Sequence, residues 1–205
     1  MSRKDALILV DVQNDFCPGG ALAVQNGDDV VPVLNRYIDK FLNAGLPIFA
    51  TRDWHPAKTS HFKAYGGMWP VHCVQGTHGA EFHPDLKITK EIIIVSTGMA
   101  SDEDGYSGFQ GRDKAGTALA TLLHDRGVDR IFVGGLATDY CVKHTVLDGI
   151  RQGFQAVLIA DAVRGVNLNP EDSERAVQEM SAAGAIVVHG TDMSDLHAYS
   201  NSLSR

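Results

Sequence analysis

Residues 130–151, RIFVGGLATDYCVKHTVLDGIR, predict a strand that leads directly into a helix. Residues 130–133 are β-branched and aromatic, as in a buried strand. Gly134-Gly135 breaks this run, and Thr138 and Asp139 stand where a helix N-cap belongs. Apolar residues then recur at helical spacing, which indicates an amphipathic helix after the turn.

Cys141 falls in the first turn of this predicted helix, at the carboxyl end of the strand. Unpaired amide N–H groups and the positive end of the helix dipole favour a thiolate at such a position. The same position also suits a small buried hydrophobe, which most free cysteines are. The remainder of the chain has to decide between a nucleophile and a structural cysteine.

The chain on either side of this segment alternates strand-like and helix-like stretches. Apolar runs predict further strands at residues 6–10, 46–51, 91–95, 155–160 and 185–188. Helical spacing of apolar residues predicts helices at residues 28–44, 114–126 and 170–183. This alternation predicts an α/β fold, a three-layer sandwich around a six-stranded, mostly parallel, Rossmann-like sheet.

Residues 53–86 interrupt the alternation. They are rich in Gly, His, Pro and Trp and have no sustained period, which predicts a long functional loop or insertion. A length of 205 residues suits a single domain, residues 1–205, that carries this insertion.

Composition and charge argue against several classes of partner. Lys and Arg total 18 against 25 Asp and Glu, a net charge of −7, and no basic run occurs, unlike in most proteins that bind nucleic acid or anionic membranes. No stretch has the features of a signal peptide or approaches the roughly 20 apolar residues of a membrane span. The three cysteines are widely spaced, as is typical of free cytosolic thiols. We expect a cytoplasmic protein that acts on a small molecule; the sequence is compatible with a homo-oligomer.

Asp11 comes directly after the apolar run of residues 6–10. A carboxylate at this place points into the crevice at the carboxyl ends of the strands, where open α/β sheets bind their ligands. If its strand neighbours the one that leads to Cys141, a raised pKa would let Asp11 act as the base for the thiol. The alternative is an ordinary capping or ion-paired Asp.

Asp53 and His55 lie two residues apart after the second predicted strand, so their side chains face the same way. His61 and His72 follow in the same loop. One carboxylate and three imidazoles form a ligand set suited to a divalent transition metal, Zn before Fe or Mn. The alternative is a set of ordinary loop histidines, since the chain has nine in all.

Several motifs appear in the order typical of one family. They are Asp11-Val-Gln-Asn-Asp-Phe16, Asp53-Trp-His-Pro56, Trp69-Pro-Val-His72 with Gln75-Gly-Thr77, Tyr106-Ser-Gly-Phe109 and Gly135-Leu-Ala-Thr-Asp-Tyr-Cys-Val142. The chain resembles the nicotinamidase/pyrazinamidase branch of the isochorismatase-like cysteine hydrolases, over about residues 6–188. The resemblance implies the isochorismatase-like hydrolase fold.

The resemblance also implies a role for each matching residue. Asp11 corresponds to the general base and Cys141 to the nucleophile, and the metal ligands correspond to Asp53, His55, His61 and His72. The aromatic residues around the substrate ring correspond to Phe16, Trp69 and Tyr106. The family's cis peptide corresponds to Leu136–Ala137, and its oxyanion hole to the N–H groups of Ala137 and Cys141.

The implied activity is hydrolysis of nicotinamide, and of pyrazinamide, to the acid and ammonia through a cysteine thioester, in NAD salvage. One position departs from the family pattern, because Thr97-Gly98 stands where the family has a catalytic Lys followed by Gly. Lys90 lies roughly 23 Å away along an extended strand, and Lys143 reaches the site only if its helix turns that side inward. We therefore expect slow turnover. Two rival functions stay open: another amidase of the family, and a metal-binding homologue of low activity.

Overall fold

The structure is a computed structural model that describes residues 4–190. The predicted domain also includes residues 1–3 and 191–205, which lie outside this part. Within residues 4–190 the strands and α-helices are β1 (Asp5–Val10), α1 (Val30–Asn43), β2 (Ile48–Asp53), β3 (Ile93–Thr97), α2 (Leu119–His124), β4 (Arg130–Leu136), α3 (Lys143–Arg151), β5 (Gln155–Arg164), α4 (Asp172–Ala182) and β6 (Ile186–Val188). None of these helices is long and apolar enough to cross a membrane.

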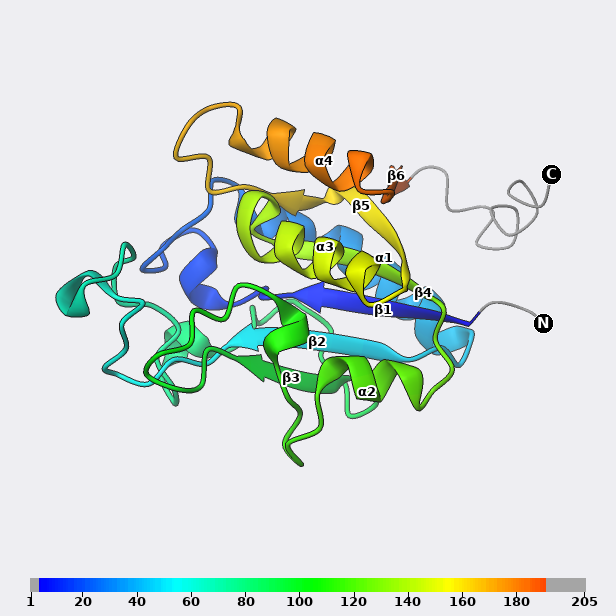
Figure 1. Ribbon diagram of the computed structural model, residues 1–205, viewed down its shortest axis with the longest axis horizontal. Helices are drawn as coiled ribbons and strands as arrows, with labels where there is room; N and C mark the ends of the chain where they lie inside the picture. The colour runs from blue at the N-terminus through cyan, green and yellow to red at the C-terminus, as the bar shows by residue number, and fades with distance from the viewer. Residues whose placement is uncertain (1–3, 191–205) are drawn as a thin grey trace.

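The strands form one sheet of six in the order β3-β2-β1-β4-β5-β6. Every neighbouring pair runs parallel. Figure 1 shows α1 behind the sheet and α2, α3 and α4 in front of it. The predicted three-layer α/β fold is therefore confirmed, with a wholly parallel sheet among the described residues.

The central strand β1 is buried on both faces of the sheet. Leu7 and Leu9 pack in the core on the side of α1, whereas Ala6, Ile8 and Val10 pack on the side of α2, α3 and α4. Successive side chains of a strand point to opposite faces, so a strand covered on both sides needs an unbroken apolar run. This explains why the sequence shows no polar alternation here.

Residues 54–92 connect β2 to β3 without an α-helix. Cys73, Ala80, Leu86 and Ile92 of this segment are buried in the core on the α1 side. The segment therefore covers the part of that face which a second helix would otherwise cover. Figure 1 shows its first part among the loops at the arrowhead ends of β1 and β2.

The strand order reverses between β1 and β4. The chain moves from β1 outward to β2 and β3, and then returns to place β4 on the other side of β1. Such a switch point opens a crevice at the carboxyl ends of the two central strands. Asp11 follows β1 and Cys141 follows β4, so both lie at this crevice.

Two predicted boundaries are wrong because pairing extends the strands. β4 continues through Gly134-Gly135, since these glycines pair with Leu9 and Val10 of β1. β5 continues to Arg164, beyond the strand predicted at residues 155–160. A register shift between Val133 and Gly135 lets the end of β5 pair again with β4.

The helix predicted at residues 114–126 is also shorter, and α2 spans only Leu119–His124. One carboxylate oxygen of Asp113 accepts N–H groups of Ala115 and Thr117, at 2.9 and 2.8 Å. These bonds stabilise a turn at the place where the predicted helix begins. Asp side chains have this effect because they bind backbone N–H groups that would otherwise take part in helical hydrogen bonds.

Gly135 sits at the closest approach of β4 to β1. Its φ of +131° is in the region that side chains rarely adopt, and a Cβ atom built there would lie 2.0 Å from the carbonyl oxygen of Val10. At Gly134, by contrast, a Cβ would lie 3.0 Å from the Leu34 side chain, 3.1 Å from the Ala162 Cβ and 3.2 Å from the Ala162 carbonyl oxygen.

We predict that Gly135→Ala lowers the free energy of unfolding by more than about 3 kcal/mol, because backbone strain and overlap with Val10 add. Gly134→Ala should lower it by only about 1–2 kcal/mol, since its new contacts are all 3.0 Å or longer and need only small shifts of the neighbours. Urea unfolding of both variants followed by circular dichroism measures the difference. Equal losses in the two variants would contradict the close β1–β4 contact.

Candidate active site

Asp11, Asp53 and Cys141 come together at the carboxyl ends of β1, β2 and β4. One oxygen or sulfur atom from each lies within 4.8 Å of the others, and all three residues are buried. The Thr51 hydroxyl, on β2, donates to Asp11 Oδ1 at 2.6 Å. The predicted meeting of Asp11 with Cys141 is present because β1 and β4 are neighbours.

Burial raises the pKa of the Asp11 carboxyl well above its usual range, and the nearby Asp53 carboxylate raises it further. Burial also raises the pKa of the Cys141 thiol, and Asp11 and Asp53 add to the effect. Two carboxylates oppose another negative charge here more than one helix end favours it, so the tendency of a helix start to favour a thiolate is overridden. The thiol keeps its proton and hydrogen-bonds with Asp11, whose raised pKa makes its carboxylate a stronger proton acceptor.

Cys141 lies in a π-helical turn, Thr138–Val142, and α3 begins only at Lys143. The N–H of Val142 donates to the carbonyl oxygen of Ala137, five residues back, at 3.1 Å. This wide turn replaces the predicted first turn of an α-helix. Turns of this kind are frequent at functional sites.

The predicted N-cap role of Thr138 and Asp139 is also wrong, because the cap residue is Ala137, without a side-chain hydrogen bond. The Asp139 carboxylate instead accepts N–H groups of Val166 and Asn167, at 2.9 and 2.8 Å. It thereby ties the turn that holds Cys141 to the chain after β5. The peptide bond between Leu136 and Ala137 is cis, as the resemblance implies.

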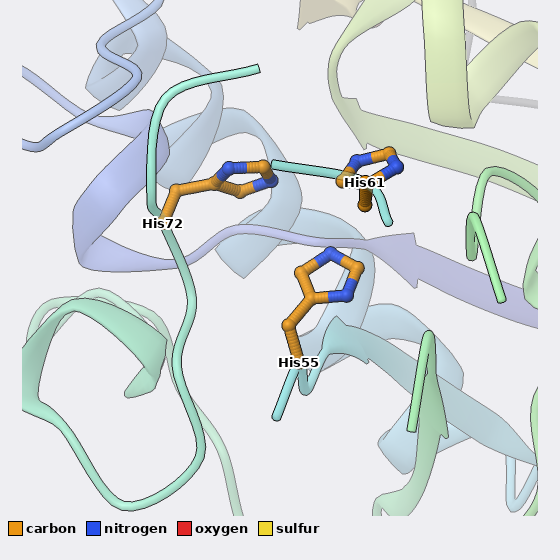
Figure 2. Close-up of side chains that lie close together, drawn as sticks. All are labelled: His55, His61 and His72. Atoms are coloured by element: carbon orange, nitrogen blue, oxygen red, sulfur yellow. The ribbon is translucent and has the colours of Figure 1, made fainter. Parts of the chain in front are cut away.

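The three histidines of the predicted metal site converge in space (Figure 2). One ring nitrogen from each of His55, His61 and His72 lies within 4.8 Å of the others, and all three residues are buried. Asp53 Oδ2 lies 3.5 Å from His55 Nε2 and 3.6 Å from His72 Nε2. The structure thus brings together all four residues that the sequence predicts as ligands.

Two of these imidazoles are oriented by backbone carbonyl groups. His55 Nδ1 lies 3.1 Å from the Gly98 oxygen, and His72 Nδ1 lies 2.8 Å from the Pro70 oxygen. Both rings therefore direct Nε2 toward Asp53, and His55 Nε2 is buried with no hydrogen-bond partner among residues 4–190. A carbonyl on one ring nitrogen and a free second nitrogen is the usual arrangement of a metal-binding His.

Charge and protonation also fit a divalent metal at this place. Burial, followed by the neighbouring His55, lowers the pKa of His61 to about 4, which keeps its ring neutral. Burial acts to raise the pKa of Asp53, but the His55 and His72 rings outweigh it and hold the pKa below its usual value. A carboxylate among three imidazoles is a donor set that suits Zn²⁺ and its neighbours.

A pocket lies beside these groups, lined by Asp53, His61, His72, Ala137 and Cys141, by the predicted aromatic residues Phe16, Trp69 and Tyr106, and by Leu22, Tyr140 and Val166. The Trp69 indole N–H donates to the Tyr106 hydroxyl at 2.7 Å, and the Trp69 ring meets Tyr140 edge-on at 4.8 Å between centroids. The pocket therefore has an aromatic wall that faces the thiol and the imidazoles.

Sequence reasoning missed several residues of this site. Thr51 orients Asp11, and the Gln13 side chain bonds both the N–H and the carbonyl oxygen of Asp53, at 2.8 Å each. Thr51 and Gln13 are polar residues near the end of a buried strand, and this was the signal in the sequence that could have identified them. Leu22 and Val166 carry no signal of their own, because loops bring them to the pocket.

Thr97 is the last residue of β3 and is buried. Its hydroxyl lies 3.1 Å from Asp53 Oδ1 and 3.2 Å from the Arg52 carbonyl oxygen. Lys143 pairs with Glu179 of α4 at 3.2 Å, and Lys90 is exposed before β3. Neither lysine therefore supplies a charge at the place of Thr97.

Comparison with known proteins places this geometry in a family. The family described as Isochorismatase domain matches residues 5–192. The nicotinamidase of Escherichia coli (strain K12) is 45% identical over 197 residues, which cover 88% of this chain and 92% of that protein.

The crystal structure of the pyrazinamidase of Pyrococcus horikoshii in complex with zinc is 46% identical, with a TM-score of 0.84, and covers 91% of this chain and 99% of that one. The crystal structure of PnC1 from L. infantum in complex with nicotinate is 35% identical, with a TM-score of 0.80, and covers 93% of this chain and 95% of that one. Sheet order, crevice residues and these matches agree, and the protein belongs to the isochorismatase family, in its nicotinamidase and pyrazinamidase branch.

Proposed function

We propose that this protein hydrolyses nicotinamide, and also pyrazinamide, to the carboxylic acid and ammonia, and that it serves NAD salvage. The contact between Asp11 and the Cys141 thiol beside an aromatic pocket is the observation that carries the proposal. The similarity to a nicotinamidase, and to a structure with bound nicotinate, supports the choice of substrate.

In the proposed reaction Asp11 accepts the proton of the Cys141 thiol, and the sulfur attacks the carbon of the carboxamide. The N–H groups of Ala137 and Cys141 stabilise the negative oxygen, a contribution of about 10²- to 10³-fold per donor in a site that excludes water. The C–N bond then breaks, and Asp11 returns the proton to the leaving ammonia. Asp11 next takes a proton from water, which cleaves the thioester and releases the acid and the thiol.

The substrate ring occupies the pocket lined by Phe16, Trp69 and Tyr106. Asp53, His55, His61 and His72 hold one divalent transition metal, with zinc as the expected ion. A metal held there would supply a Lewis acid for a nitrogen lone pair such as that of the pyridine ring. The aromatic wall and the imidazoles then leave the carboxamide at the end of the pocket nearest Cys141.

A second candidate is a homologue that binds the same ligand but turns it over slowly. The observation that favours it is Thr97, a short neutral residue where the family has a Lys. Another amidase of the family, acting on a carbamoyl or ureido compound, is less favoured because the metal ligand set and aromatic wall suit a flat heterocycle.

We predict ammonia release from nicotinamide by the zinc-loaded protein, and its loss by at least about 10³-fold in Cys141→Ala and in Asp11→Asn. The reason is that one variant lacks the nucleophile and the other lacks the proton acceptor. Cys17→Ala is the matched control, because this buried cysteine does not line the pocket. Unchanged ammonia release in Cys141→Ala would overturn the proposed mechanism.

We predict that Asp53→Ala loses the metal, because the substitution removes the anionic ligand of the site. Elemental analysis after reloading and desalting should give about one equivalent of metal for the wild type and below about a tenth for the variant. Asp15→Ala is the control, since this carboxylate binds backbone N–H groups of Cys73 and Ala21 instead. A wild type that holds below about a tenth of an equivalent would rule the metal site out.

We predict that Thr97→Lys raises the turnover number at saturating nicotinamide and matched metal content, by up to about 10²- to 10³-fold. An ammonium group near Asp11 and Cys141 would stabilise the thiolate and the charge that develops during attack. Thr97→Met is the control for side-chain size without charge. The assigned role fails if Thr97→Lys changes nothing, or if the wild type already turns over as fast as a typical amidase.

A further inference from the structure

The Asp53 carboxylate has different neighbours on its two oxygens. Oδ2 faces His55 and His72, at 3.5 and 3.6 Å, whereas Oδ1 lies 3.1 Å from the Thr97 hydroxyl. Each of the two oxygen atoms of this carboxylate therefore has its own role. One oxygen is directed at the imidazoles, and the other is anchored to the neighbouring strand β3.

The Asp53 backbone is fixed independently of its side chain. Gln13, which is fully buried, donates to the Asp53 carbonyl oxygen and accepts the Asp53 N–H, both at 2.8 Å. Rotation of the carboxylate about its side-chain bonds is then the freedom that remains. The Thr97 hydroxyl contacts Oδ1 at 3.1 Å.

The methyl group of Thr97 lies beside Gly111. A Cβ atom built at Gly111 would lie 2.9 Å from the Thr97 methyl carbon, so the methyl group occupies the space beside that glycine. The hydroxyl is within reach of both the Arg52 carbonyl and Asp53 Oδ1. It donates preferentially to the carboxylate, because hydrogen bonds to a charged acceptor are about twice as strong as neutral ones.

We propose that Thr97 is a positioning residue for the metal site: its hydroxyl holds Asp53 Oδ1 and so presents Oδ2 to the ion held by His55, His61 and His72. The inference rests on the metal site of the proposed function. A neutral donor orients the carboxylate without cancelling the charge that attracts the ion. The residue that replaces the family Lys thus has a function of its own, separate from acceleration of the reaction.

The test is zinc affinity, measured by competition with a chromophoric chelator, for the wild type, Thr97→Val and Thr97→Ser. Loss of an outer-shell partner typically weakens metal binding by about 10- to 100-fold, and we expect this for the near-isosteric Thr97→Val. Thr97→Ser keeps the hydroxyl and should stay within about threefold of the wild type. The visible spectrum of the Co²⁺-loaded protein should change in Thr97→Val and be restored in Thr97→Ser.

Thr51→Val is the matched control, because Thr51 is an equally buried threonine whose hydroxyl holds Asp11 instead of Asp53. It should leave zinc affinity within about threefold of the wild type. Urea unfolding of the metal-free proteins distinguishes positioning of Asp53 from a purely structural role of Thr97. A purely structural role would lower the free energy of unfolding of the variants without changing their zinc affinity. If Thr97→Val does not fold, Thr97→Ala removes the same hydroxyl from a smaller side chain.

Wild-type zinc affinity in Thr97→Val or Thr97→Ala overturns the inference, as does an equal loss in Thr51→Val. A wild type that binds no zinc overturns it together with the metal part of the proposed function. If zinc affinity depends on Thr97 as expected but the wild type releases no ammonia, the inference stands and only the proposed activity is removed.

Discussion

The pairing of β1 with β4 at the centre of the sheet is the contact on which the site depends. It runs from Asp5 opposite Arg130 to Val10 opposite Gly135, so that the two strands end side by side. A doubly hydrogen-bonded ion pair between Asp5 and Arg130, at 2.8 Å, anchors the far end. At the near end only a glycine allows the backbones to meet as they do. The residues that follow, Asp11 and Cys141, are thereby brought into contact although 130 positions separate them in sequence (141 − 11).

The second constraint is electrostatic, because this contact buries two carboxylates and a thiol in one small volume. Three negative charges cannot coexist there, and the surroundings divide the protons between them. His55 and His72 hold Asp53 in its charged form, whereas burial and that charge raise the pKa values of Asp11 and Cys141. Two carboxylates in one site therefore acquire different tasks, a ligand and a proton acceptor, from their environments alone.

The sequence predicted those parts of the molecule that depend on local pattern. The unbroken apolar run of β1, the residues at strand ends and the Asp53–His55 spacing were sufficient to predict the layers and the chemical groups of the site. The adjacency of β1 and β4 was an expectation that follows from topology, and the structure has it. Family resemblance added the aromatic residues, which no periodicity distinguishes from core.

What could not be predicted depends on contacts between distant segments. The pKa of a cysteine at a helix start also depends on burial and on carboxylates that follow β1 and end β2, so the local pattern alone could not predict that the pKa of Cys141 is raised. The π-helical turn depends on the hydrogen bond from the Val142 N–H to the Ala137 carbonyl oxygen. The Asp139 carboxylate does not cap the helix and instead accepts a hydrogen bond from the chain after β5. Thr97 shows the same limit, because the sequence alone does not reveal that its hydroxyl lies 3.1 Å from Asp53 Oδ1.

The central claim is that the Cys141 sulfur carries the acyl group of the substrate. Its most direct test is mass spectrometry of the zinc-loaded protein, quenched in acid during turnover of nicotinamide and digested into peptides. We predict a nicotinoyl adduct on the peptide that contains Cys141, formed and lost at rates that account for turnover. Ammonia release without such an adduct, or an adduct only on the peptides of Cys17 or Cys73, would contradict the account.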